Sequence, residues 1–112
     1  MLLAPRASPR DSTRMFGRVF GLTETTRSAM QRRIEAREGV LMRQLVSAAV
    51  GPWIRVPTLM VHDREDRINR FTGGQAYAHA VRGAQLLATE GLGHRRMLKD
   101  PAVLGKVALF TP

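Results

Sequence analysis

The chain has 112 residues, a formal net charge of +9 and no cysteine, so it can form one domain at most and holds neither disulfides nor thiolate metal sites. Apolar residues make up 44% of the sequence, which is ordinary for a globular protein, and no apolar run approaches the roughly 18 residues of a membrane span. The charge comes from 16 arginines and 2 lysines. We interpret it as a solvated basic surface and expect no specific nucleic-acid partner, because aromatic residues do not interleave with the basic ones.

Residues 1–21 contain two prolines, four arginines and one acid, without a helical or strand period. We predict that this segment is a disordered basic tail. Its richness in arginine and serine would also suit an organellar transit peptide, although no amphipathic face is evident. The apolar run at residues 1–4 is too short for a secretory signal peptide, so we expect a cytoplasmic protein.

Residues 22–52 are predicted to be helical. Thr23 suits an N-cap, Glu24 suits the first turn, and Gly39 suits the C-terminal end, so the pattern predicts a helix from Thr23 to Glu38. The apolar stripe of this helix is narrow, which is typical of a helix on the surface. A second, short helix is predicted over 41–50, before the Gly-Pro pair at 51–52 breaks it.

Residues 53–112 read as strand, helix, strand, helix. The continuous apolar run 58–61 predicts a strand buried on both faces, with a charged loop over 62–67 after it. A helix over 72–81, a strand over 85–89 and a glycine-bearing loop over 90–95 follow. Asp100 and Pro101 begin a last helix. This order implies an α/β class with two parallel strands and a right-handed crossover.

Asp66 and His94 are the residues that we expect to carry chemistry. Both follow predicted strands, and reactive groups of open α/β sheets gather beyond the carboxyl ends of the strands. Histidine is a base that titrates near neutral pH, and a carboxylate beside it would hold the ring in one tautomer. Gly91 and Gly93 let the backbone bend, so that the ring can point back over the strand ends.

Five stretches of the sequence together form a longer pattern. They are Ile54–Leu59 (Ile-x-Val-Pro-x-Leu), His62–Asp66 (His-x-x-x-Asp), Gly83–Leu86, Gly91–His94 (Gly-Leu-Gly-His) and Leu98–Pro101 (Leu-x-Asp-Pro). In register over about half the chain, they closely resemble a C-terminal pattern of the α/β-hydrolase superfamily. The resemblance implies a partial α/β-hydrolase sheet of two parallel strands with crossover and flanking helices. Residues 53–112 would be its C-terminal βαβα unit and 22–52 a helical cap or linker.

The same resemblance implies catalytic roles for the two residues. In the superfamily the triad partners follow in the order Ser, Asp, His, so Asp66 would be the acid and His94 the base. Asp63, where many relatives have glycine, and Glu65 flank Asp66. The family register favours Asp66, and the other two carboxylates stay open as alternatives.

The remaining candidates have simpler interpretations. We expect a structural role for His62 and a solvated helix position for His79. Arg95 and Arg96 are interpreted as solvated loop charges, with orientation of an acidic substrate as an alternative. A metal cluster of His62, Asp63, Asp66 and His94 has no fixed geometry in the sequence, so we expect neither a metal nor a cofactor.

The nucleophile of a serine hydrolase is missing from the sequence. No Gly-x-Ser-x-Gly occurs, and Ser8, Ser12, Ser28 and Ser47 lack its glycines. We therefore expect a truncated hydrolase that carries the acid and the histidine of a triad and is inactive alone. It would be related to enzymes that hydrolyse small esters or acyl compounds. Its open sheet edge would pair in a dimer or with a complementing chain. The alternative is a non-catalytic interaction module that uses this edge; a nucleic-acid binder is the weakest hypothesis.

Overall fold

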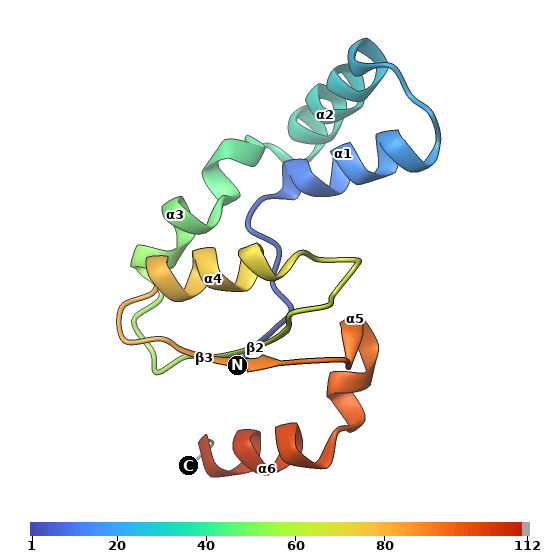
Figure 1. Ribbon diagram of the computed structural model, residues 1–112. Coiled ribbons are helices and arrows are strands. Elements are labelled where there is room, and N and C mark those ends of the chain that lie inside the picture. Colours follow the sequence, from blue (N-terminus) through green and yellow to red (C-terminus); the bar gives the residue numbers. More distant parts are fainter. Residues whose placement is uncertain (111–112) are drawn as a thin grey trace.

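A computed structural model describes residues 1–110 of the chain. A parallel sheet in the order β1-β2-β3 lies between two layers of helices. Helices α3 and α4 cover one face and α6 covers the other, while the α1–α2 hairpin extends beyond the sheet (Figure 1). The elements, with η for short 3₁₀ helices, are β1 (Leu2–Leu3), α1 (Pro9–Val19), α2 (Glu24–Glu38), η1 (Met42–Leu45), α3 (Ser47–Val50), η2 (Gly51–Trp53), β2 (Leu59–Asp63), α4 (Phe71–Ala80), β3 (Gln85–Thr89), α5 (Gly93–Arg96), η3 (Met97–Lys99) and α6 (Pro101–Phe110).

The α/β class with parallel strands is confirmed. Strand β2 pairs with β3 over five residues, from Leu59 opposite Gln85 to Asp63 opposite Thr89. All five residues of β2 are buried, because strands flank it on both sides and helices cover both faces. The strand runs two residues beyond the predicted apolar stretch, and Asp63 is therefore its last residue rather than a loop residue.

The prediction that residues 1–21 are disordered is wrong. Leu2 and Leu3 form β1, which pairs in parallel with Met60 and Val61 of β2, so the sheet has three strands and not two. A strand of two residues is too short to show a period in sequence. It forms because the edge of β2 that β3 leaves open offers unpaired backbone groups, and because Ala4 enters the core and donates its N–H to Val61 O at 2.8 Å.

Helix α1 was also missed, since polar contacts rather than an apolar face attach it to the rest of the molecule. Ser8 caps it by accepting from the Arg10 N–H at 3.2 Å, and Pro9 occupies its first turn. The exposed fractions of Phe16 and Phe20 are 46% and 63%, so the apolar side of the helix faces away from the core. A pattern of buried apolar residues was therefore not available to predict it.

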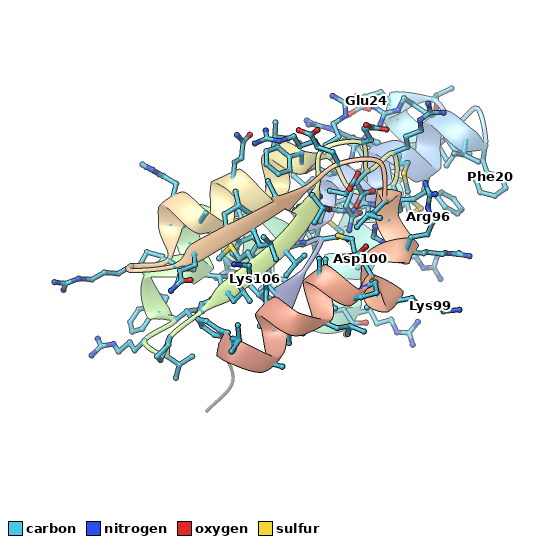
Figure 2. All side chains as sticks on the ribbon, turned by 60° about the horizontal axis from the view of Figure 1, so that its bottom comes forward. Phe20, Glu24, Arg96, Lys99, Asp100 and Lys106 are labelled. Atoms are coloured by element: carbon cyan, nitrogen blue, oxygen red, sulfur yellow. The ribbon has the colours of Figure 1, made fainter. Side chains whose placement is uncertain are left out.

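A buried arginine joins α1 to α2. Arg27 is 5% exposed and lies against Gly17 of α1. Its guanidinium donates to both carboxylate oxygens of Glu24, at 2.8 and 2.5 Å, and to the Thr13 hydroxyl at 3.1 Å. Figure 2 shows Glu24 and Phe20 together at this end of the molecule. Hydrogen bonding from Arg27 lowers the pKa of Glu24 to about 2.

The helices predicted over 23–38, over 72–81 and from Pro101 are confirmed as α2, α4 and α6, with ends shifted by one residue at most. Helix α2 has the predicted caps: the Thr23 hydroxyl accepts from the Thr26 N–H at 3.2 Å, and Gly39 follows in the left-handed conformation. The helix predicted over 41–50 is broken into η1 and α3. Helix α6 begins at Pro101, where Asp100 caps it by accepting from the Val103 N–H at 3.0 Å. The division of the chain at residues 21 and 52 stays a prediction.

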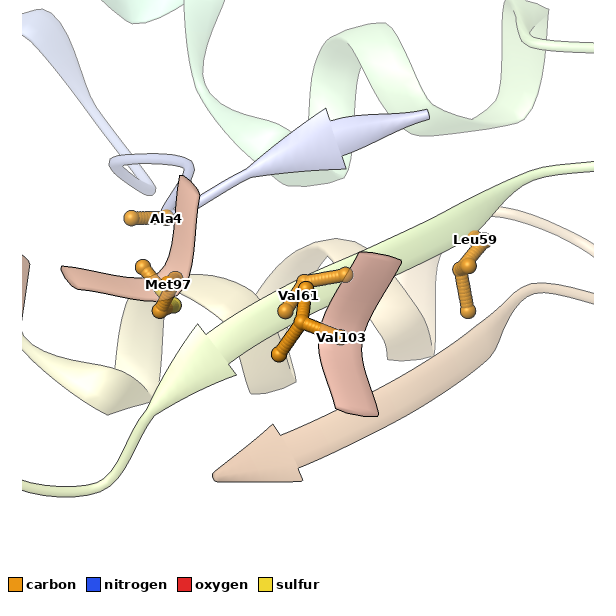
Figure 3. Packing of buried hydrophobic residues seen from close by; sticks show 5 residues of the cluster. All are labelled: Ala4, Leu59, Val61, Met97 and Val103. Carbon is orange, nitrogen blue, oxygen red and sulfur yellow. The ribbon is translucent and has the colours of Figure 1, made fainter. Parts of the chain in front are cut away.

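The hydrophobic core lies between the sheet and α6. Five buried side chains meet there, from β1's C-terminal end, β2, η3 and α6 (Figure 3): Ala4, Leu59, Val61, Met97 and Val103. Leu87 and Leu92 pack against this cluster from the side of β3. The core therefore fixes β2, β3 and the segment after β3 relative to one another. No helix within residues 1–110 combines the length and the apolar character that crossing a membrane requires.

Candidate active site

Asp66 and His94 meet at the carboxyl ends of β2 and β3. Asp66 lies three residues beyond β2, and His94 is the second residue of α5, five residues beyond β3. The ring atom Nδ1 of His94 lies 2.8 Å from Oδ2 of Asp66. The strands are parallel and adjacent, so their ends bring together two residues that are 28 positions apart in sequence.

Asp66 is held by its own loop. Its Oδ1 accepts hydrogen bonds from the backbone N–H groups of Ile68 and Asn69, both at 2.8 Å. This arrangement is an Asx-turn. Burial raises the pKa of the Asp66 carboxyl, but hydrogen bonds from His94, Asn69 and Ile68 outweigh burial and leave this pKa below its usual range. The group is therefore a carboxylate at neutral pH and accepts the Nδ1 proton of His94.

The second ring nitrogen of His94 is left open. Its side chain is 32% exposed, whereas that of Asp66 is fully buried. With Nδ1 facing Asp66, no hydrogen bond from residues 1–110 engages Nε2. Gly91 and Gly93 have φ angles of 73° and 66°, which side chains disfavour. These two predicted glycines make the bend that turns the ring toward Asp66.

Arg96 closes the loop that carries His94. Its Nε donates to Leu92 O at 3.0 Å and its Nη2 to Gly91 O at 2.6 Å. Figure 2 shows Arg96 on this turn, close to Lys99 and Asp100. The sequence interpretation as a solvated charge missed this role, because a side-chain bond to a loop carbonyl leaves no pattern in sequence. Arg95 is exposed.

Asp63, the first alternative acid, bonds to the end of β3 and to the loop between β3 and His94. Its Oδ2 accepts from the Thr89 hydroxyl at 2.7 Å and from the Leu92 N–H at 3.0 Å, and its Oδ1 accepts from the Glu65 N–H at 2.9 Å. Burial raises the pKa of the Asp63 carboxyl, but these hydrogen bonds outweigh it and lower the pKa. Asp63 thus bonds to the loop before His94 and not to the ring. Glu65, the second alternative, is exposed.

His62 is enclosed behind Asp66. It is fully buried, its Nε2 lies 2.8 Å from Asn69 O and 3.5 Å from Asp66 Oδ2, and its ring meets Phe71 edge-on. The ring therefore packs between β2 and α4, in the structural position that we expected. Within residues 1–110, no three His, Cys, Asp or Glu side chains are grouped so that they could hold a metal ion.

The serines serve other purposes in the described part of the chain. Ser8 caps α1, the Ser28 hydroxyl donates to Glu24 at 3.4 Å, and Ser47 begins α3. No hydrogen bond within residues 1–110 joins a serine to His94. The described residues thus bring together a buried carboxylate and an imidazole whose Nε2 is open. His79 is exposed on α4.

Comparison with known proteins identifies the fold. No family model matches the chain, and no curated protein matches it. Among solved structures, the chain is similar to MGS-MChE2, an alpha/beta hydrolase enzyme from the metagenome of sediments from the lagoon of Mar Chica, Morocco. The TM-score is 0.56 at 12% sequence identity.

The similarity covers 96% of this chain and 46% of the other, so the chain spans about half the length of that enzyme. At this identity the likeness shows the fold alone. The three-stranded parallel sheet with its flanking helices is a partial, distantly related α/β-hydrolase-like fold.

Proposed function

We propose that Asp66 and His94 are the acid and the base of a Ser-Asp-His triad in an ester- or acyl-cleaving hydrolase. The observation that carries the proposal is the 2.8 Å contact between His94 Nδ1 and a buried Asp66 carboxylate, with Nε2 left open. Asp66 would fix the tautomer and stabilise the charged ring. Nε2 would then take the proton of a serine hydroxyl as its oxygen attacks the acyl carbon, and give it to the leaving group.

The nucleophile and the oxyanion hole are proposed to come from polypeptide outside these 112 residues. The sequence lacks Gly-x-Ser-x-Gly, and an acid–base pair without a nucleophile and oxyanion donors has nothing to activate. β1 and β3 each have a strand neighbour on one side only within residues 1–110. These open edges are where further strands of a hydrolase sheet would pair.

An activity assay in two arms tests this proposal. The 112-residue protein alone is expected to hydrolyse a short-chain nitrophenyl ester no faster than buffer. If the DNA upstream of the Met1 codon encodes a Gly-x-Ser-x-Gly segment, expression of both parts together is expected to give esterase activity. His94→Ala should then lower it by about 10⁴-fold, whereas His79→Ala, an exposed histidine of α4, should leave it unchanged.

Each of two results would contradict one part of the proposal. Labelling of the 112-residue protein by a serine-directed probe, with burst kinetics that vanish in His94→Ala, would show that the nucleophile lies within the chain. Esterase activity of the joined parts that survives His94→Ala would show that the pair is not the acid and base.

The open edge of β1 favours a second candidate, a non-catalytic module that binds another chain there. Leu3 is 37% exposed on this strand, and an unpaired edge is a template for strand addition. Under this candidate, Leu3→Lys abolishes an association seen by analytical ultracentrifugation, and His94→Ala changes no measurable property. Esterase activity dependent on His94 would exclude it.

A further inference from the structure

A basic cleft lies between α1 and the loop that joins β2 to α4. It encloses about 320 Å³. Figure 1 shows α1 above this loop, with α5 on the other side of it. Five arginines and one acid line the cleft, from two segments almost fifty residues apart: Arg6, Arg14, Arg18, Arg67, Arg70 and Asp11.

The walls of the cleft are tied together by specific contacts. Arg6 Nη2 donates to Ile68 O at 3.0 Å, and Asn69 Nδ2 donates to Ala4 O at 2.7 Å. The backbone after β1 also packs closely on α4: a Cβ at Gly73 would lie 2.5 Å from Pro5 O. The two basic segments are therefore held in place by the fold, and a ligand meets a largely formed site.

Positive charge in the cleft is poorly compensated. Among residues 1–110, no ion pair joins any of the five arginines to a carboxylate, although Arg14 lies within electrostatic reach of Glu24. The N-terminus of α4 adds to the potential: Arg70 gives it no side-chain cap, and its first turn holds no acid. The cleft thus carries four more positive than negative side chains.

We propose that this cleft binds a small organic anion with two or more negative charges, in phosphate or carboxylate groups, as part of the substrate. Guanidinium groups pair with phosphate groups and with carboxylate groups through two parallel hydrogen bonds. The volume of the cleft is that of a small-ligand site. The loop that forms one wall is the loop that holds Asp66: Ile68 and Asn69 line the cleft and donate to its carboxylate. The link to the substrate rests on the proposed function, whereas anion binding itself does not.

Calorimetric titration with pyrophosphate and, separately, with citrate tests the cleft at about 0.15 M salt. We expect one site on the purified protein. Arg67→Gln/Arg70→Gln should weaken binding about tenfold or more, because charge-assisted hydrogen bonds are lost. Asp11→Asn should strengthen it by about twofold to fivefold, because a like charge beside the ligand is removed. Binding by one probe only would assign phosphate or carboxylate as the preferred group.

The matched control removes the same charge elsewhere. Arg33→Gln/Arg55→Gln changes two exposed arginines that do not line the cleft, and should leave both affinities unchanged. Equal weakening by both double variants, no binding of either probe, or tighter binding of a short single-stranded oligonucleotide that ignores the cleft variants would overturn the proposal. The two proposals fail separately. The esterase assay uses a nitrophenyl ester without an anionic group, so a protein that binds neither probe would overturn the cleft proposal alone.

Discussion

The Thr89 hydroxyl donates a hydrogen bond of 2.7 Å to Asp63 Oδ2, and this joins the last residues of β2 and β3. The same oxygen accepts from the Leu92 N–H, two residues before His94. Asp63 is thus a positioning residue for the loop, while Asp66 meets the ring.

Replacement of Asp63 is expected to destabilise the protein. Asp63→Ala would leave the Leu92 and Glu65 N–H groups and the Thr89 hydroxyl without their acceptor. Each unsatisfied buried group costs about 1–3 kcal/mol, and three groups lose their acceptor, so urea denaturation should show a loss of about 3 kcal/mol or more. Glu65→Ala, an exposed acid in the same loop, should stay within about 0.5 kcal/mol of the wild type. Equal losses would show that the Asp63 bonds contribute little.

Acid should destabilise the protein through the two buried carboxylates. The pKa values of Asp63 and Asp66 both lie below the ordinary 3.8. Their contribution is therefore fully present above that value and is lost as the pH falls through the lower pKa of the folded state. Urea denaturation at about pH 5 and about pH 3 should show a smaller difference in Asp66→Asn than in wild type. An unchanged difference would mean that Asp66 is not held as a carboxylate.

Two buried glycines are expected to respond in opposite ways to alanine. A Cβ at Gly17 would lie 3.5 Å from Arg27 Cγ, an ordinary contact, whereas one at Gly74 would lie 2.5 Å from His62 Nδ1. Gly17→Ala should stabilise by about 0.5–1 kcal/mol, because alanine loses less backbone entropy in a helix. Gly74→Ala should destabilise by about 1–3 kcal/mol, since His62 is fully buried. Thermal unfolding of both variants checks the pair, and a stable Gly74→Ala protein would contradict the packing of α4 on β2.

The sequence predicted the parts of the fold that have their own period or caps. Strand β3 was predicted residue for residue, and the Thr23, Gly39 and Asp100 caps hold α2 and α6 as expected. The parts missed, β1 and α1, are fixed by tertiary contacts: pairing of β1 with β2, and the buried Arg27 between α1 and α2. Local patterns do not encode such contacts.

For the candidate site, the sequence predicted the residue types and the edge of the sheet. The resemblance of the sequence to the hydrolase pattern favoured Asp66 over its neighbours. The structure places Asp66, rather than Asp63 or Glu65, beside the ring of His94. The orientation of the Asp66 carboxylate depends on hydrogen bonds from Ile68 and Asn69, and that of Asp63 on a hydrogen bond from Thr89. These partners are distributed over two loops, so spacing alone left the choice open. The catalytic role of the pair stays a prediction.

The tautomer of His94 tests the central claim most directly. Nuclear magnetic resonance with isotope-labelled histidine, at about pH 9 where free imidazole is neutral, reports which ring nitrogen carries the proton. We predict that it lies on Nδ1, which faces Asp66, that Nε2 is unprotonated, and that Asp66→Asn abolishes this preference. A proton on Nε2 in the wild-type protein would contradict the account, because the unprotonated nitrogen would then be Nδ1, which faces Asp66, and the open nitrogen could not act as a base.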